Sequence, residues 1–212
     1  MYAPKIPDEL WPMTGEERGY PIVDVHGHHG QLMELIDGSP GKIMPVSKII
    51  LALEKYFRHH DMSMEEFLAT LPTEAELVTL FKKYDIHATP CAWVAPYGTG
   101  ETGEENKGHD NDYIEALVKR HPDIFLGWWG SVDPHLGVLA LEEAEKLLRD
   151  KKVIGLKFQQ TLQKFRVNDP MCYPLWDIVA NYNGFVQFHG GYTGAGTGLP
   201  GGAGVRCFKY TN

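Results

Sequence analysis

Two histidines separated by a single residue are the first group in this sequence that could do chemistry. His26 and His28 follow residues 21–23, a short apolar run that is typical of a buried strand. Because side chains alternate across a strand, both imidazoles point to one face, where together they could hold a divalent metal ion. Asp24 shares that face one step earlier and could orient a ligand histidine through a hydrogen bond. The alternative is a pair of solvated histidines at the end of a strand.

Two further polar residues lie near the ends of apolar segments. Lys157 in residues 153–158 and His189 in residues 185–189 each lie opposite the larger apolar side chains of the segment. An inward lysine could act in catalysis, as a metal-binding carbamate or as a partner for a substrate carboxylate, or could be structural and paired with a buried acid. His189 is either a satisfied core histidine or a metal ligand, and its position before a glycine-rich loop favours the ligand. Neutral imidazoles suit zinc, manganese and iron.

The glycine-rich segment after His189 is a candidate substrate loop. Residues 190–204 (GGYTGAGTGLPGGAG) contain eight glycines, which allow positive φ angles and close approach of the backbone to a ligand. The segment has neither the Lys-Ser or Lys-Thr ending of a phosphate-binding loop nor the spacing of a dinucleotide-binding turn. We expect it to cover substrate, and a merely flexible connection is the alternative. The basic residues beyond it could attract an anionic substrate or could be solvated surface charges. The predicted substrate contacts are Gly190, Gly191, Thr193 and Arg206.

These candidate residues are positioned by a regular alternation of predicted strands and helices. Apolar runs predict strands at 22–27, 88–94, 124–129, 153–158 and 185–189. Helical spacing and turn signals predict intervening helices at about 112–121, 138–151 and 172–182. This rhythm indicates parallel β–α–β units. In a (β/α)₈ barrel the active site lies at the carboxyl ends of the strands, where the three histidines and Lys157 would converge.

The rest of the chain is predicted to form a helical insertion, an acidic loop and an N-terminal arm. Residues 31–84 are a predicted insertion after the first strand, with apolar side chains at helical spacing over 46–59. Residues 97–112 have the composition of an acidic loop, and residues 1–20 that of an extended, proline-rich arm. Within the insertion, two capping-box sequences predict helix starts at Ser63 with Glu66 and at Thr73 with Glu76.

Composition limits what the chain can bind. Its 212 residues are 43% hydrophobic with a formal net charge of −8, which is ordinary for a globular protein of one or two domains. The acidic balance and the lack of a long basic run argue against nucleic acid. We predict no membrane span and no secretory signal, and cysteine usage indicates a reducing, cytoplasmic location. The three cysteines are interpreted as small buried apolar residues: Cys91, Cys172 and Cys207.

Taken in order, these motifs resemble the amidohydrolase-2 (ACMSD-like) branch of the amidohydrolase superfamily. The resemblance implies a (β/α)₈ TIM-type barrel in which His26, His28 and His189 bind a divalent metal, zinc in preference to manganese. It implies a hydrolase or a nonoxidative decarboxylase that acts on a small carboxylate- or carbonyl-bearing substrate through metal-activated water or metal-polarised substrate. The matching segments are DVHGH at 24–28, GWWGSVDP at 127–134, VIGLKF at 153–158, NDP at 168–170, YPL at 173–175 and FHGGYTGAGTGLPGGAG at 188–204.

The chain departs from the family pattern in two ways. Gln159 stands where many relatives carry a histidine. We expect residues 21–212 to hold only about five of the eight βα units, without the later histidine and metal-binding aspartate of the family. Open strand edges then favour a homo-oligomer. The alternative function is an inactive barrel fragment that serves as a metal-binding or interaction module. A metal-dependent nuclease on the same barrel is disfavoured by the acidic composition.

Overall fold

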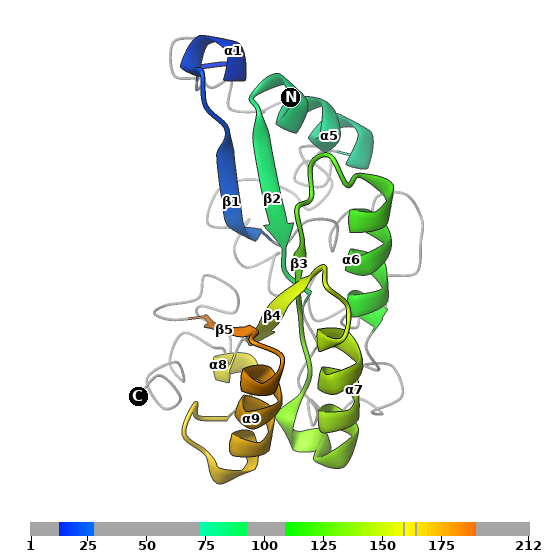
Figure 1. The fold of residues 1–212 in the computed structure, drawn as a ribbon, viewed down its shortest axis with the longest axis vertical. Helices are drawn as coiled ribbons and strands as arrows, with labels where there is room; N and C mark the ends of the chain where they lie inside the picture. The colour runs from blue at the N-terminus through cyan, green and yellow to red at the C-terminus, as the bar shows by residue number, and fades with distance from the viewer. Residues whose placement is uncertain (1–12, 28–72, 93–108, 159, 164, 190–212) are drawn as a thin grey trace, which may run out of the picture.

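Parallel strands with helices outside them form the part of the chain that the structure describes. This structure is a computed structural model, and it describes residues 13–27, 73–92, 109–158, 160–163 and 165–189 (Figure 1). The strands within these ranges are β1 (Ile22–Gly27), β2 (Ile86–Pro90), β3 (Trp128–Gly130), β4 (Val153–Phe158) and β5 (Phe185–Phe188). Every pairing between these strands is parallel, which confirms the α/β organisation predicted from the sequence.

The strands follow one another across the sheet in the order of the chain. β1 pairs with β2, and β3, β4 and β5 form a second group in that order. Isolated parallel bridges join the two groups, from Ala88 to Phe125 and from Cys91 to Trp129. The predicted neighbours are therefore correct. A closed barrel is not seen among the described residues.

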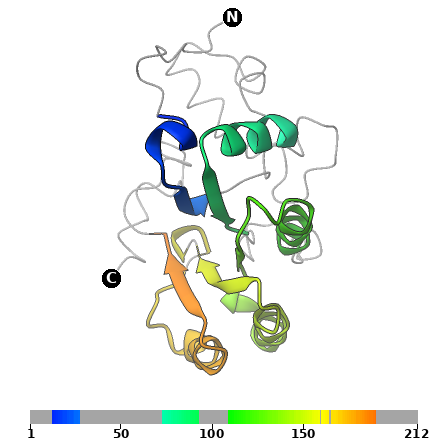
Figure 2. The same ribbon diagram turned by 45° about the horizontal axis from the view of Figure 1, so that its top comes forward.

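Helices cover the outer side of the strands. Figure 2 shows α5, α6, α7 and α9 arranged around them. No described helix is both long and apolar enough to cross a membrane. The helical segments are α1 (Gly15–Arg18), α5 (Glu74–Lys83), α6 (His109–Arg120), α7 (Val138–Leu148), α8 (Gln160–Gln163) and α9 (Tyr173–Asn181), with 3₁₀ turns η2 (Pro134–Leu136) and η3 (Pro170–Cys172).

Capping boxes explain where two of these helices begin. The predicted box at α5 is confirmed, because Thr73 Oγ1 accepts from Glu76 N at 3.3 Å and Thr73 N donates to the Glu76 carboxylate at 2.8 Å. Thr14 and Glu17 form the same box at α1, inside the segment predicted to be an extended arm. The predicted helix at 46–59, the box at Ser63 and residues 97–108 of the acidic loop lie outside the described residues.

Several element boundaries differ from the sequence prediction. β2 begins at Ile86, two residues before the predicted start, and regular pairing ends at Pro90, which has no N–H to donate. The predicted strand at 124–129 is regular only from Trp128, since Phe125 forms only an isolated bridge to Ala88, and the β3–β4 register shifts between Trp128 and Trp129. β4 has the predicted bounds, and α6, α7, α9 and β5 differ from theirs by one to three residues at an end.

The apolar faces of β4 and β5 pack against the helices, as predicted. The Phe158 ring is fully buried, stacks on Phe188 at 5.8 Å and meets the edges of Phe165 and Trp176 at 5.5 and 5.4 Å between centroids. Leu156 is buried in the same core. Burial of these side chains on one face leaves the opposite face of both strands for polar residues.

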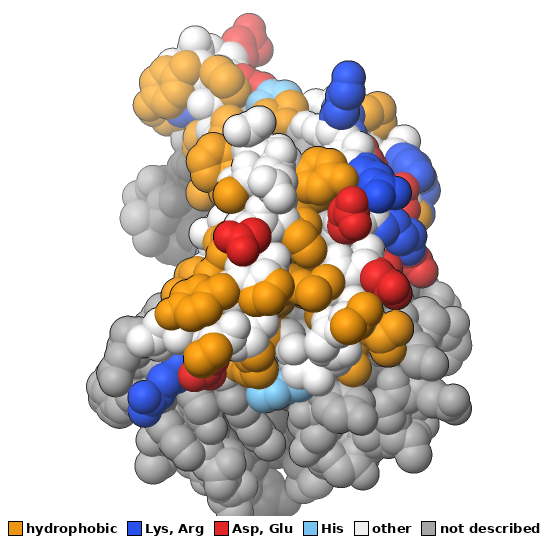
Figure 3. Space-filling model, turned by 60° about the horizontal axis from the view of Figure 1, so that its bottom comes forward, with side chains coloured by type: hydrophobic (Ala, Val, Ile, Leu, Met, Phe, Trp, Pro, Cys, Tyr) orange, Lys and Arg blue, Asp and Glu red, His pale blue; other side chains and the backbone are white. Residues whose placement is uncertain are grey.

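A further apolar surface lies where two helices begin. Figure 3, which turns the bottom of Figure 1 forward, shows hydrophobic side chains over much of the described surface, with charged side chains between them and along one edge. The first turns of α7 and α9 contribute exposed Val138, Leu139 and Tyr173. In parallel βα units a helix begins on the side where the preceding strand ends. This apolar surface therefore lies on the same side of the sheet as the strand ends that carry the candidate site.

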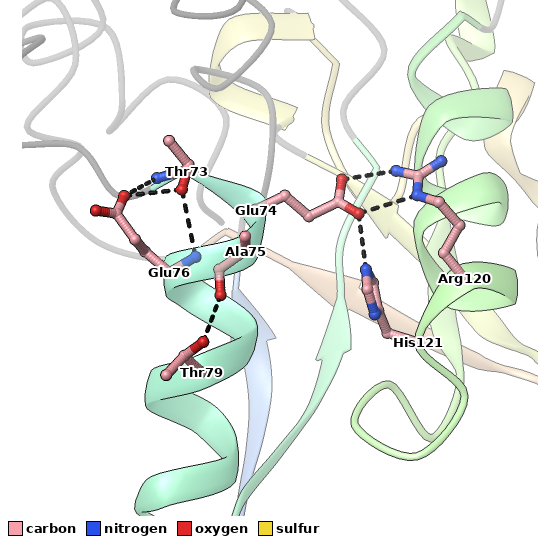
Figure 4. A network of polar contacts seen from close by, with 7 residues as sticks. All are labelled: Thr73, Glu74, Ala75, Glu76, Thr79, Arg120 and His121. Atoms are coloured by element: carbon pink, nitrogen blue, oxygen red, sulfur yellow. Dashed lines mark hydrogen bonds and ion pairs between the residues drawn. The ribbon is translucent and has the colours of Figure 1, made fainter.

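A charged cluster ties α5 to the end of α6 (Figure 4). Arg120 binds both carboxylate oxygens of Glu74, at 3.0 and 2.8 Å, and His121 Nε2 lies 2.7 Å from Glu74 Oε1. The hydrogen bond from Arg120 is the main reason that the pKa of Glu74 lies below its usual value. Glu74 is thus a link between two helices that flank β2.

We expect Glu74→Gln to destabilise the protein by about 1 kcal/mol at neutral pH, the range of partly exposed ion pairs. A carboxyl with a lowered folded-state pKa contributes stability above its unfolded pKa and loses it as pH falls through the folded value. The difference from wild type should therefore disappear in acid. Urea unfolding from pH 7 to pH 3 measures it, with Glu142→Gln on exposed α7 as the control. An equal loss at both pH values would contradict this role.

Candidate functional site

His26 and His189 come together at the carboxyl ends of two strands. His26 lies near the end of β1 and His189 directly follows β5. Their ring centroids are 6.0 Å apart and the rings are nearly perpendicular, with an interplanar angle of 85°. β1 and β5 are not paired within the described sheets, so this proximity comes from the curvature of the strand array. Two predicted ligands are thus adjacent, and the third, His28, lies outside the described residues.

Lys157 is buried on the inner face of β4. Its side chain is 1% exposed, it pairs in register with Gln187 of β5, and its Nζ makes no hydrogen bond to the described part of the chain. Burial lowers the pKa of the Lys157 ammonium to about 8, and the nearby Cys91 thiol opposes the shift. The proposed pairing with a buried acid is not seen among the described residues. The ammonium is instead a desolvated cation on the face that carries the histidines.

Replacing this lysine is expected to stabilise the metal-free protein. Lys157→Met should add up to about 3 kcal/mol at pH 7, because each unit of pKa shift is worth about 1.4 kcal/mol. A base whose folded pKa is lowered costs stability below about pH 8, and the cost fades as pH approaches the ordinary value of 10.5. Urea unfolding at pH 7 and pH 10 would show the gain shrinking, with exposed Lys152→Met as the control. A pH-independent gain would contradict the electrostatic explanation.

The two histidines are set up to be neutral. Partial desolvation of each ring, and then the positive charge of Lys157, lower the pKa of both the half-buried His189 and His26, although His26 keeps an exposed surface. A neutral imidazole keeps the lone pair that a metal ion binds. His189 Nδ1 is buried and has no hydrogen-bond partner in the described residues. These properties fit a divalent metal, although no group of three potential ligands occurs within the described ranges.

Hydrogen bonds hold the backbone on both sides of each histidine. Asp24 Oδ1 accepts from the backbone N–H of His26 at 2.9 Å, a contact with the main chain and not with the imidazole, so the orientation of a ligand ring by Asp24 stays a prediction. His189 N donates to Phe158 O at 3.0 Å, and Gln160 Nε2 donates to His189 O at 2.8 Å. His189 is therefore held to β4 by a main-chain bond and to α8 by a side chain, whereas this contact of His26 lies within β1.

The inner face also carries polar residues that the sequence analysis did not assign to the site. Trp129 Nε1 donates to Thr89 Oγ1 at 3.2 Å, and Thr89 Oγ1 lies 3.5 Å from Asp24 O. Cys91 Sγ donates to Gln187 Oε1 at 3.5 Å. Gln187 precedes His189 by two residues, so strand alternation places both on one face, and this signal could have pointed to Gln187. Cys91 was interpreted only as a buried apolar residue, and no sequence signal pointed to its hydrogen bond.

The remaining predicted residues divide between core and undescribed segments. Cys172 is buried and unpaired, and burial raises the pKa of its thiol to about 12, in keeping with an apolar role. The predicted substrate contacts lie outside the described residues, as does Cys207. These contacts are Gly190, Gly191, Thr193 and Arg206.

Comparison with protein families adds an independent observation to this geometry. A family model described as amidohydrolase matches residues 93–208, which is more than half of the chain. The chain belongs to the amidohydrolase family. The family membership predicted from the ordered motifs is thereby confirmed. A comparison with curated proteins gives no match to this amidohydrolase-family chain.

Solved structures of larger proteins share the fold. A 5-carboxyvanillate decarboxylase from Novosphingobium aromaticivorans DSM 12444, bound to manganese and 4-hydroxy-3-methoxy-5-nitrobenzoic acid, matches with a TM-score of 0.58 at 16% identity, over 85% of this chain and 53% of that chain. An amidohydrolase II structure matches with a TM-score of 0.54 at 14% identity, over 84% and 52%. The amidohydrolase-family chain thus spans about half the length of these proteins, and at such identities the likeness concerns the fold alone.

Proposed function

We propose that this chain carries the metal-binding half-site of a divalent-metal-dependent enzyme that decarboxylates or hydrolyses a small carboxylate-bearing substrate. The observation that carries the proposal is the adjacency of His26 and His189, with ring centroids 6.0 Å apart, beside a buried lysine on the same face. Family membership supports enzymatic chemistry of this class. Because a manganese-bound decarboxylase shares the fold, decarboxylation with Mn²⁺ is the first reaction to test, and zinc is the second metal.

His26, His28 and His189 would hold the metal, which when bound supplies Lewis-acid polarisation of a substrate oxygen or a water molecule. The chain's own residues prepare the site for it. Partial desolvation lowers the pKa of the two described imidazoles and so favours the neutral form, which carries the lone pair that a metal ion binds.

Lys157 is proposed to bind the substrate carboxylate. With a pKa of about 8 its ammonium is mostly protonated at pH 7, yet it makes no hydrogen bond to the described residues. A carboxylate placed beside it would form a charge-assisted hydrogen bond and offset the cost of burying the cation. In this arrangement the lysine orients the substrate, and Lys157→Met should raise KM for carboxylate substrates more than it weakens metal binding.

The test combines metal binding with turnover. Purified chain with Mn²⁺ is assayed for release of carbon dioxide from hydroxylated aromatic acids, including 5-carboxyvanillate, and for hydrolysis of small amides. Mn²⁺ binding, and any turnover that accompanies it, should be removed by EDTA, abolished by His189→Ala and left intact by His87→Ala at the amino end of β2. Stoichiometric Mn²⁺ without turnover would favour the metal-binding module instead. Failure to bind either Mn²⁺ or Zn²⁺ would exclude both functions.

A further inference from the structure

We infer that the Gln187 side chain sets the separation of His26 and His189 by linking β5 to the end of β1. This positioning role rests on the proposed function, because it matters for chemistry only if both histidines bind one metal. Gln187 lies two residues before His189 on the inner face of β5, in register with Lys157 of β4. No sequence motif marks Gln187 as a site residue. Its hydrogen bonds are what single it out among the residues of β5.

The carboxamide of Gln187 is linked to both neighbours of His26 in β1, directly to Val25 and through Cys91 to Gly27. Gln187 Nε2 donates to the carbonyl of Val25 at 3.4 Å, directly before His26. Gln187 Oε1 accepts from Cys91 Sγ at 3.5 Å, and the backbone N–H of Cys91 donates to Gly27 O at 2.8 Å, directly after His26. The main chain of His26 is therefore connected to Gln187 on one side directly and on the other side through Cys91.

The other end of the link is rigid. The β4–β5 ladder runs from Gly155 with Phe185 to Phe158 with Phe188, so the backbone of Gln187 is fixed against β4. His189 is held to the same strand by its N–H bond to Phe158 O. The backbone bridges between the two groups of strands run through β2, and no backbone pairing in the described residues joins β5 to β1 directly. The carboxamide of Gln187 spans that gap.

The contact needs a group that donates and accepts at once. A methionine has a similar length, no donor and only a weak acceptor, whereas a glutamate keeps the acceptor but, when ionised, faces the Val25 carbonyl without a proton to donate. Gln163 offers a control, since its Nε2 also donates to a main-chain carbonyl, that of Val132 at 2.9 Å, and Gln163 is fully buried whereas Gln187 is half-buried. Its loss should disturb packing elsewhere and leave the histidine pair unchanged.

The experiment compares Gln187→Met, Gln187→Glu and Gln163→Met with wild type. Mn²⁺ affinity is measured by calorimetry, and Co²⁺ absorption spectra report the geometry of the ligands. Groups that orient metal ligands typically change affinity by about 10- to 100-fold. We expect a loss in that range and an altered Co²⁺ spectrum for both Gln187 variants, with Gln163→Met unchanged in both. Unchanged affinity and spectrum in the Gln187 variants would overturn the inference.

A metal-free measurement separates this inference from the proposed function. With selectively labelled histidines, a nuclear Overhauser effect between the rings of His26 and His189 is expected in wild type and in Gln163→Met. The effect should be lost or clearly weakened in Gln187→Met. If that variant does not fold, the same measurement is made on Gln187→Glu. If wild type binds no metal, the proposed function fails, and this effect alone decides the positioning role. Equal intensity in wild type and the Gln187 variants would refute it.

Discussion

Replacing His26 and His189 together with alanine should lower the affinity of the chain for Mn²⁺ by more than about 100-fold, because even residues that merely orient metal ligands cost up to that factor. The two rings are the described pair that could share one ion, and burial beside Lys157 favours the neutral form of each. Removing one ring leaves the other as a single metal ligand of the described pair. Each single variant should therefore retain weak binding that the double variant lacks.

Elemental analysis after dialysis against Mn²⁺, followed by calorimetry, measures the loss. His87→Ala is the control, since His87 lies at the amino end of β2, away from the histidine pair. Neither His26 nor His189 belongs to the apolar core, so the double variant should keep the circular dichroism of wild type. Equal, stoichiometric metal in wild type and the double variant would show that the ligands lie elsewhere.

Gly155→Ala is expected to separate β4 from β5 and to destabilise the protein by about 3 kcal/mol or more, at the upper end of overpacking effects. A methyl group at Gly155 would overlap the carbonyl oxygen of Phe185 and lie 2.7 Å from its nitrogen. Both atoms belong to the backbone of the paired strand, so no side-chain rotation can make room. The strand that moves carries Gln187 and His189, and metal affinity should fall along with stability.

Gly130→Ala tests whether the loss is specific to that contact. Its added methyl would meet the Cδ1 atom of Leu147 at 3.0 Å, the far end of a flexible side chain that can turn away. We expect a cost of about 1 kcal/mol or less for this variant, because side-chain repacking absorbs most of the overlap. Urea unfolding of both variants gives the comparison. Equal, small losses would mean that β4 and β5 can shift without penalty.

The sequence predicted the bounds of β4 and the start of α5 correctly, because the signals for both lie within a few consecutive residues. β4 has the predicted bounds because an apolar face and an inward lysine alternate without interruption from Val153 to Phe158. α5 begins at its capping box because Thr73 and Glu76 satisfy each other's backbone. The same reciprocal pair at Thr14 and Glu17 was overlooked, since the prolines before it suggested an extended arm.

The sequence predicted which residues lie at the ends of the strands. It did not predict the hydrogen bonds between their side chains. Alternation placed Lys157, Gln187 and His189 on one face, and the structure keeps them there. No local pattern could show that a carboxamide on β5 meets the Val25 carbonyl, because that contact depends on how far the strands curve. The role of Cys91 was hidden for the same reason, since a buried thiol has no sequence signature for its partner.

The contact between β1 and β5 has a consequence for the order in which the protein can form. The other strand contacts join elements that follow one another along the chain, whereas Gln187 and Val25 are 162 positions apart. Contacts of such long range close a large loop and tend to come late in folding. The pair of imidazoles therefore exists only once β5 has docked near β1. During refolding, metal binding should therefore report the docking of β5 near β1, and it should appear later than the circular dichroism of the helices.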